Sequence, residues 1–125
     1  MKSVKLALIL LAGGTGTRIN RKISKQMIMF NNFTILELNI INFMKELKNV
    51  PIQIVTNDKD FLNVSEICNK YNLLSPVIGG DERHESTYNG IKSIKHINPK
   101  YVLIHDTARP IISSVVIKSL VAYSK

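Results

Sequence analysis

The chain has 125 residues and a formal net charge of +8 at pH 7, with 45% hydrophobic residues, 21% charged residues and one cysteine. This composition excludes a disordered chain, and the single cysteine, Cys68, excludes an intrachain disulfide and a cysteine-based zinc site. The positive charge favours an anionic ligand, but only 6% of the residues are aromatic and no adjacent basic run exceeds Arg21-Lys22, so the pattern that stacks nucleic-acid bases is absent from the sequence.

The first element expected along the chain is a strand at residues 6–12, LALILLA. The run is continuous and short and is followed by Gly13 and Gly14, which is typical of a strand buried on both faces. It is far shorter than the roughly 20 residues that a membrane-spanning helix needs. Lys2 and Lys5 before it also permit a short secretory signal. We favour the strand, and with it a cytoplasmic protein without a membrane or nucleic-acid partner.

A helix and a second strand follow. Thr34 and Glu37 have the spacing of a capping box, which begins a helix. Apolar residues then recur at helical spacing, at Leu36, Ile40, Phe43, Met44 and Leu47. Pro51 stops this helix before the strand expected at residues 52–56, IQIVT. The preceding residues 15–33 have no hydrophobic period and are expected to form a loop.

The rest of the chain continues the alternation. Asp58 is expected to cap a helix that carries Phe61, Leu62, Val64, Ile67 and Cys68. A short strand at residues 75–79, SPVIG, precedes a helix at about 85–96 whose apolar face comprises Tyr88, Ile91, Ile94 and Ile97. A strand at 101–105, YVLIH, and a helix capped by Ser113 or Ser114 are expected after it.

Short apolar strands that alternate with helices predict an open, doubly wound α/β domain with a mostly parallel sheet. At this length we expect a single domain, residues 1–125. The last helix should lead to a further strand. We therefore expect an apparently truncated fold, the N-terminal half of a longer protein.

Polar clusters follow three of the strands, and ligands of open α/β sheets bind at this edge. The first is the loop from Gly13 to Lys25, in which glycines let backbone N–H groups approach phosphate oxygens. It is not a Walker A loop, because no Gly-Lys-[Ser/Thr] sequence occurs, and Ile19 stands where a dinucleotide fingerprint needs its third glycine. Arg18 and Lys25 are suited to stabilise negative charge on a transferring phosphoryl group. The alternative is a glycine turn with two surface cations.

The second cluster follows the strand at 75–79. Gly79 and Gly80 let the backbone present donors and acceptors to a flat ligand edge. Asp81 is suited to accept a hydrogen bond from an exocyclic amine, and Ser86 to bond a ribose hydroxyl. The alternative is an ordinary turn before a helix, with acidic residues favoured by the helix dipole.

The third cluster follows the strand at 101–105. Asp106 at a strand tip is suited to hold Mg²⁺ against substrate phosphates, because this ion takes one or two carboxylates and keeps waters. Arg109 would pair with an anionic group, and the alternative is a structural Asp–Arg ion pair. We expect His105 to pack at the strand end rather than to act as a base.

Together these motifs resemble a known family. The sequences LLAGGTGTR, SKQ, GGDERHESTYNGI and VLIHDTARP, in this order, are similar to the 2-C-methyl-D-erythritol 4-phosphate cytidylyltransferase family from Leu6 to about Ser113. The glycine loop alone resembles sugar-nucleotide transferases in general, and the pairing of GGxxRxxS with HDxARP is more specific. The resemblance implies a nucleotide-diphospho-sugar transferase-like fold. It also implies transfer of CMP from CTP to a sugar-alcohol phosphate, with release of pyrophosphate, in non-mevalonate isoprenoid synthesis.

The resemblance assigns roles to individual residues. Arg18 and Lys25 would stabilise the α-phosphorus in the transition state, Asp106 would bind Mg²⁺ and the substrate, and Arg109 would bind the substrate beside it. The nucleotide-binding residues that it implies are Ala12, Gly13, Gly14, Thr15, Gly16, Gly80, Asp81 and Ser86. A full-length family member would form a homodimer.

Two departures and several alternatives remain open. Ser24 stands where the family usually has proline, and the loss of proline should loosen the loop that holds Lys25. The resemblance also implies a protein about twice as long as this chain. Ribitol-5-phosphate cytidylyltransferase is the nearest alternative, and Ala108 before Arg-Pro favours the erythritol enzyme. A transferase for another base, a non-catalytic nucleotide-binding module and a decayed remnant are the others. Retention of Arg18, Lys25 and Asp106 together argues against a remnant.

Overall fold

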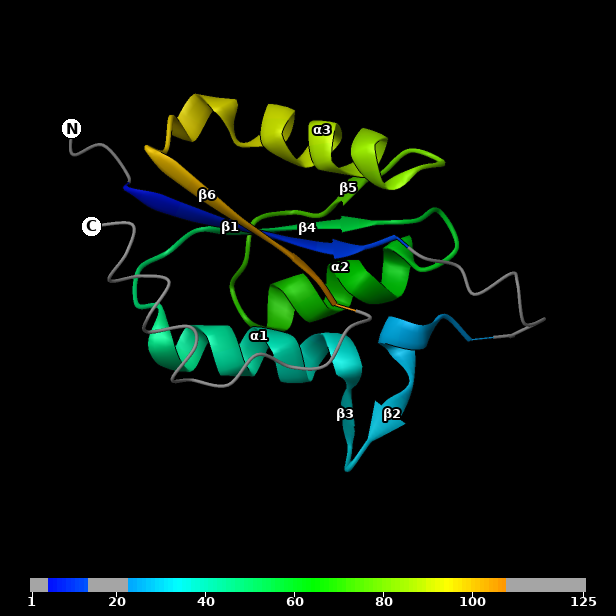
Figure 1. The fold of residues 1–125 in the computed structure, drawn as a ribbon. Coiled ribbons are helices and arrows are strands. Elements are labelled where there is room, and N and C mark those ends of the chain that lie inside the picture. The colour runs from blue at the N-terminus through cyan, green and yellow to red at the C-terminus, as the bar shows by residue number, and fades with distance from the viewer. Residues whose placement is uncertain (1–4, 14–22, 108–125) are drawn as a thin grey trace.

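The computed structural model describes residues 5–13 and 23–107 (Figure 1). Its centre is a four-stranded sheet in the order β5-β4-β1-β6, and all neighbouring strands in it are parallel. The strands are β1 (Leu6–Ala12), β4 (Ile52–Thr56), β5 (Val77–Ile78) and β6 (Tyr101–Asp106). The expected open α/β fold with a mostly parallel sheet is confirmed. The helix expected after Ser113 or Ser114 lies outside the described residues.

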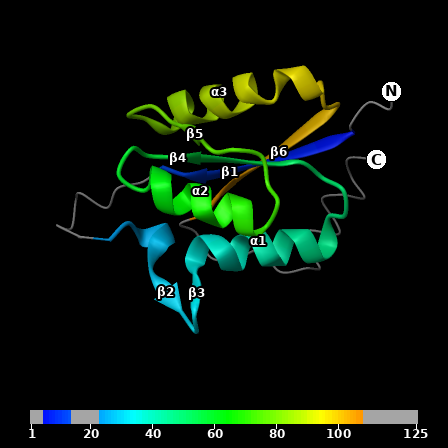
Figure 2. The same cartoon turned by 180° about the vertical axis from the view of Figure 1, so that it is seen from behind.

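Helices cover both faces of this sheet (Figures 1 and 2). α1 (Ile35–Glu46) and α2 (Phe61–Lys70) lie on one face, and α3 (Arg83–Ser93) lies on the other, followed by the short 3-10 helix η3 (Lys95–Ile97). Within the described ranges, no helix has the length and apolar character to cross a membrane.

The strand β1 lies in the middle of the sheet and divides the core in two. Leu8 and Leu10 pack with α1 and α2, whereas Ala7 and Ile9 pack in the smaller cluster on the α3 side. This alternation follows from the two-residue period of a strand, in which successive side chains point to opposite faces. Each of these side chains is fully buried, which explains why the run is apolar at every position.

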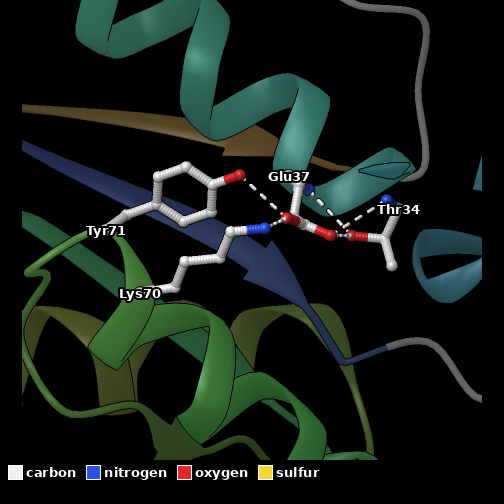
Figure 3. Close-up of polar contacts among 4 residues, drawn as sticks. All are labelled: Thr34, Glu37, Lys70 and Tyr71. Carbon is white, nitrogen blue, oxygen red and sulfur yellow. Dashed lines mark hydrogen bonds and ion pairs between the residues drawn. The ribbon is translucent and has the colours of Figure 1, made fainter. Parts of the chain in front are cut away.

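The expected capping box at the start of α1 is present. The Glu37 backbone N–H donates to Thr34 Oγ1 at 3.0 Å, and the Thr34 N–H donates to Glu37 Oε1 at 3.1 Å. Glu37 also reaches α2, where its Oε2 accepts from Tyr71 Oη at 2.8 Å and pairs with Lys70 Nζ at 3.0 Å (Figure 3). A local helix-start signal therefore also joins two helices.

Three expected details of the elements were wrong. The helix α2 begins after Asp60, not at Asp58, because the Asn57 side chain accepts from the Asp60 N–H at 2.7 Å and holds an intervening turn. The strand expected at 75–79 pairs only at Val77–Ile78. In place of one helix at 85–96, α3 begins after a capping box formed by Glu82 and Glu85 and ends at Ser93, before η3.

The buried face of α3 also differs from the expected one. Tyr88 is 64% exposed and Ile91 44% exposed, whereas Ser86 and Gly90 face the sheet. A Cβ on Gly90 would lie 2.9 Å from Val55 Cγ2 and 3.0 Å from an Ile9 methyl group. Ile94, at the C-cap of α3, and Ile97, in η3, pack in the core on this side of the sheet as expected. The expected face is therefore wrong only within α3, where the helix contacts the sheet through its smallest residues.

A hairpin occupies part of the segment expected to be a loop. β2 (Met29–Phe30) pairs antiparallel with β3 (Phe33–Thr34), preceded by the 3-10 helix η2 (Lys25–Met27). The two turn residues, Asn31 and Asn32, have φ of 51° and 72°. Positive φ at both positions suits the two-residue hairpin turns in which asparagine is favoured.

Candidate active site

The carboxyl ends of β1, β5 and β6 meet around one cavity of about 230 Å³. Five of the residues that the sequence singles out line it: Gly13, Gly80, Asp81, Ser86 and Asp106. Leu11, Gln26, Glu82 and Arg83 complete the lining. Segments more than 90 residues apart in the sequence, such as Gly13 and Asp106, therefore come together as the switch-point rule for open α/β sheets requires.

Other expected site residues are less well placed or lie outside the description. Ala12 is buried at the end of β1, and Lys25 is exposed at the start of η2; neither is among the residues that line the cavity. The expected residues outside the described ranges are Gly14, Thr15, Gly16, Arg18 and Arg109.

Gly79 and Gly80 allow the first turn of α3 to approach the end of β5 closely. A Cβ on Gly79 would overlap the Ser86 side chain and lie 2.9 Å from Val55 Cγ1, and a Cβ on Gly80 would overlap Glu85. Ser86 is 7% exposed, and its hydroxyl donates to the Gly80 carbonyl oxygen at 3.5 Å. The two glycines thus have a packing role as well as the open backbone expected from the sequence.

The end of β6 carries two residues with different environments. Asp106 lines the cavity, whereas His105 is 8% exposed and packs edge-on against Phe43 at 5.3 Å between ring centroids. Asn39 Nδ2 donates to the carbonyls of Ile35 and Thr107, so its Oδ1 accepts from His105 Nε2 at 3.0 Å. Burial lowers the pKa of His105, although the Asp106 carboxylate acts in the opposite direction. These contacts agree with the expected packing role.

Sequence reasoning gave no role to three polar residues beside the first glycine. Gln26 is 1% exposed and its Nε2 donates to the Ala12 carbonyl oxygen at 2.9 Å. Asn57 Nδ2 donates to the Gly13 carbonyl oxygen at 3.3 Å and to Asp60 Oδ2 at 3.0 Å. Gln26 ends the SKQ motif of the family resemblance, but that motif gives it no contact and no role.

Ser24 precedes η2 at the position where the resemblance expects proline. Its φ of −62° and ψ of 146° are those that proline adopts. The residue is fully buried, and its hydroxyl has no hydrogen-bond partner in the described part of the chain. The backbone conformation that proline would impose is therefore present without it.

The residues of the cavity can be tested for a metal ion. Asp106 supplies one carboxylate to the lining of the cavity, and this donor fits Mg²⁺, which binds one or two carboxylates together with substrate phosphates. Glu82, His84 and Glu85 bring ligand atoms within 4.8 Å of one another, but all three are exposed. Glu82 and Glu85 also form the capping box at the start of α3, in which the Glu85 carboxylate accepts from the Glu82 N–H at 3.3 Å.

Comparison with known proteins decides the family. Residues 6–125 match the sequence profile of IspD, 2-C-methyl-D-erythritol 4-phosphate cytidylyltransferase. The chain belongs to this family. It is 36% identical over 123 residues to the 2-C-methyl-D-erythritol 4-phosphate cytidylyltransferase of Clostridium botulinum, a match that covers 96% of this chain and 53% of that protein. It is 35% identical over 123 residues to the bifunctional IspD/IspF enzyme of Wolbachia pipientis, covering 96% of this chain and 31% of that protein.

Solved structures of the family have the same fold. The 4-diphosphocytidyl-2C-methyl-D-erythritol synthase from Anaerococcus prevotii superposes with a TM-score of 0.75 at 25% identity, covering 99% of this chain and 53% of that one. The bifunctional IspDF from Campylobacter jejuni gives a TM-score of 0.73 at 24% identity and covers 94% of this chain and 30% of that one, a likeness of fold. The chain thus spans about half the length of the single-function IspD proteins that it matches.

Proposed function

We propose that this IspD chain belongs to an enzyme that transfers CMP from CTP to 2-C-methyl-D-erythritol 4-phosphate and releases pyrophosphate. The observation that carries the proposal is the shared cavity, in which residues from three strand ends meet in a chain that matches the family over residues 6–125. In this reaction a phosphate oxygen of the acceptor bonds to the α-phosphorus of CTP, the bond from that phosphorus to the α–β bridging oxygen breaks, and pyrophosphate leaves.

For this reaction the protein must hold CTP and the acceptor phosphate in line and stabilise the negative charge on the transferring phosphoryl group. No covalent intermediate with the protein is needed. Gly13 and Gly80 offer backbone groups at the cavity wall, and Asp81 is suited to accept from the exocyclic amine of cytosine. Ser86 lies at the same wall, where we assign it to the ribose side. Lys25 is assigned to the triphosphate because η2 is joined to the end of β1 through Gln26.

Residues outside the described ranges enter the proposal by their position in the family motifs. Gly14, Thr15 and Gly16 would cradle the triphosphate, Arg18 would share its charge with Lys25, and Arg109 would bind the acceptor phosphate. Asp106 is the residue that we assign to Mg²⁺ and to the substrate. When bound, the ion would neutralise charge on the phosphate oxygens.

Three wider proposals accompany this one. Residues 1–125 are proposed to be one nucleotide-binding domain, the N-terminal half of a longer transferase, supported by the share of each relative that the chain covers. That the longer transferase forms a homodimer is proposed from the family resemblance alone. A cytoplasmic location is proposed because residues 6–12, the segment weighed as a secretory signal, form the central strand of the sheet.

Thermal melts with Mg²⁺ and each of CTP, UTP, ATP and GTP test the nucleotide half of the proposal. We expect CTP alone to raise the melting temperature, because a ligand that binds only the native state stabilises it by mass action. Arg18→Ala and Lys25→Ala should reduce this rise. A cooperative melt that no nucleotide shifts would refute the assignment of this cavity to CTP.

Pyrophosphate release then tests the acceptor. 2-C-methyl-D-erythritol 4-phosphate and ribitol 5-phosphate are each supplied with CTP and Mg²⁺ to the full-length protein. Release with the erythritol phosphate alone is the expected result. Release with ribitol 5-phosphate alone would overturn the acceptor but keep the cytidylyl chemistry.

A further inference from the structure

A small polar cluster joins three segments beside the start of the glycine loop. Gln26, Asn57 and Asp60 form it, and we call it the Asp60 cluster. Asp60 Oδ2 accepts from Asn57 Nδ2 at 3.0 Å and from Gln26 Nε2 at 3.4 Å. Asp60 is 5% exposed and Gln26 is 1% exposed, so the bond between them is buried, whereas the bond from the half-buried Asn57 is partly buried. Buried polar groups of this kind hold a specific geometry, because each unmade bond is costly.

The same two amides also hold the end of β1. Gln26 donates to the Ala12 carbonyl oxygen at 2.9 Å, and Asn57 donates to the Gly13 carbonyl oxygen at 3.3 Å. The Asp60 carboxylate therefore links the Gln26 and Asn57 amides, which donate to the successive carbonyl oxygens of Ala12 and Gly13. This arrangement sets where the backbone leaves the sheet and enters the glycine loop.

The cluster also sets the place of Lys25, which directly precedes Gln26 in η2. The η2 turn is short and closed by two backbone bonds, Met27 N–H to the Ser24 oxygen at 2.9 Å and Ile28 N–H to the Lys25 oxygen at 3.3 Å. A 3-10 turn of this length has little stability of its own. The position of η2 relative to β1 must therefore come from tertiary contacts. Among these are the hydrogen bonds that the Gln26 side chain donates to Ala12 in β1 and to Asp60.

We propose that Gln26, Asn57 and Asp60 are positioning residues. They hold Lys25 at a fixed place relative to the carboxyl end of β1, so that its ammonium group can bind the triphosphate. The inference rests on the proposed function for the identity of the anion. The contacts that carry it do not depend on a ligand. Gln26 acts through Lys25, and Asp60 acts through both amides.

The first experiment needs no nucleotide. Hydrogen exchange of the Met27 and Ile28 amides is measured by NMR in the reference chain, in Gln26→Met and in Asp60→Asn. Methionine keeps the volume of glutamine but donates no hydrogen bond. We expect both amides to exchange about tenfold faster or more in each variant, because η2 opens locally once it is released from β1.

The chain offers a matched control in Gln53. This glutamine is 3% exposed and its Nε2 donates to the Ser75 carbonyl oxygen at 2.7 Å, away from η2. Gln53→Met removes an equally buried amide and should leave exchange at Met27 and Ile28 within about twofold of the reference. Equal acceleration in Gln53→Met and Gln26→Met would mean general destabilisation and would overturn the proposal.

The second experiment is a double-mutant cycle on CTP affinity, measured by calorimetry with Mg²⁺ in the reference chain, Gln26→Met, Lys25→Ala and the double variant. If Gln26 acts through Lys25, Gln26→Met weakens affinity about tenfold in the reference background and less than about twofold once Lys25 is alanine. A purely structural role predicts effects that add, and additive effects would overturn the proposal.

The outcomes separate this inference from the proposed function. A reference chain that exchanges as expected but does not bind CTP refutes the nucleotide assignment, and the exchange data then decide the anchoring by themselves. A reference chain that binds CTP with unchanged affinity in Lys25→Ala refutes the role of Lys25, and the positioning role falls with it.

Discussion

Two helices of this chain begin with the same local device, and they use it differently. α1 begins with a capping box between Thr34 and Glu37, and α3 begins with one between Glu82 and Glu85. Thr34 and Glu37 are 7% and 6% exposed, whereas Glu82 and Glu85 are both exposed. The same sequence spacing therefore gives a core element in one helix and a surface element in the other.

The buried capping box of α1 also contributes to the packing of α1 against α2. Glu37 accepts from Tyr71 and pairs with Lys70, which joins α1 to α2 (Figure 3). α3 has no such pair in the described residues, and small residues seat it instead: Gly79 and Gly80 precede it, and Gly90 faces Val55. A capping box predicts where a helix begins, but its burial decides how much stability depends on it.

The largest expected effect is that of Glu37→Ala. The substitution removes one half of the capping box and leaves the Tyr71 hydroxyl and Thr34 without their acceptor. We expect the free energy of unfolding to fall by about 2–4 kcal/mol, from the cap and the charged hydrogen bonds. Lys70 adds little to this, since its side chain is 58% exposed and regains water. Urea denaturation checks the value, and a loss below about 1 kcal/mol would contradict the distinction between the two boxes.

Gly79→Ala tests how α3 is seated. The new methyl group would overlap Ser86 and approach Val55 Cγ1 to 2.9 Å, so we expect a loss of about 1–3 kcal/mol by urea denaturation. Gly13→Ala is the matched control, because a Cβ there would lie 3.7 Å from Ser86 Oγ, an ordinary contact. Equal stabilities of the two variants would show that close approach does not seat this helix.

Glu37 also gives the buried box a dependence on pH. Burial by itself would raise the pKa of Glu37, but hydrogen bonds from Thr34, Tyr71 and Lys70, and the charge of Lys70, outweigh it and lower the pKa below 4.5. The unfolded chain therefore binds the proton first as the pH falls. The stability that this carboxylate contributes is complete above pH 4.5 and is lost as the pH falls through the lowered pKa.

Glu37→Gln should weaken the dependence of the free energy of unfolding on pH in the acid range. We expect the variant to lose less stability than the reference chain between about pH 5 and pH 3, measured as urea midpoints at each pH. Parallel curves for the two chains would mean that the Glu37 carboxylate does not contribute through its ionisation.

The smallest expected effect is that of Glu85→Ala in the exposed box. Its carboxylate accepts from the Glu82 N–H at 3.3 Å in full contact with solvent, which replaces the bond when it is removed. We expect a loss of at most about 1 kcal/mol, read from the same urea series. A loss equal to that of Glu37→Ala would show that burial does not separate the boxes.

The sequence predicted the elements whose signals are local. The run at residues 6–12 is apolar at every position because β1 is buried on both faces, and the Thr34–Glu37 spacing marked the start of α1 correctly. The Asn31-Asn32 turn was missed because it lacks the glycine that usually marks a two-residue hairpin turn, although asparagine tolerates the positive φ found at both positions. The expected face was right for Ile94 and Ile97 but wrong for Tyr88 and Ile91 within α3, because hydrophobic periodicity does not detect a contact made by a glycine.

The site could be predicted in part for the same reason. Polar clusters at strand ends are local patterns, and the parallel order of the sheet brings Gly13, Gly80 and Asp106 to one cavity. The Asp60 cluster could not be predicted, because Gln26 and Asp60 lie 34 residues apart and meet only after β4 and α2 have packed. Contacts between distant polar side chains have no sequence period.

An NMR map of where CTP with Mg²⁺ binds tests the proposed nucleotide site most simply. We expect the largest chemical-shift changes at Gly13, Gly80, Ser86 and Asp106, around the cavity at the carboxyl edge of the sheet. A second, larger groove of about 520 Å³ lies between η2, the hairpin and α2, lined by Met29, Asn63, Glu66 and Lys70 among others. Chemical-shift changes centred on that groove, with none at Ser86 and Asp106, would contradict the assignment of CTP to the cavity.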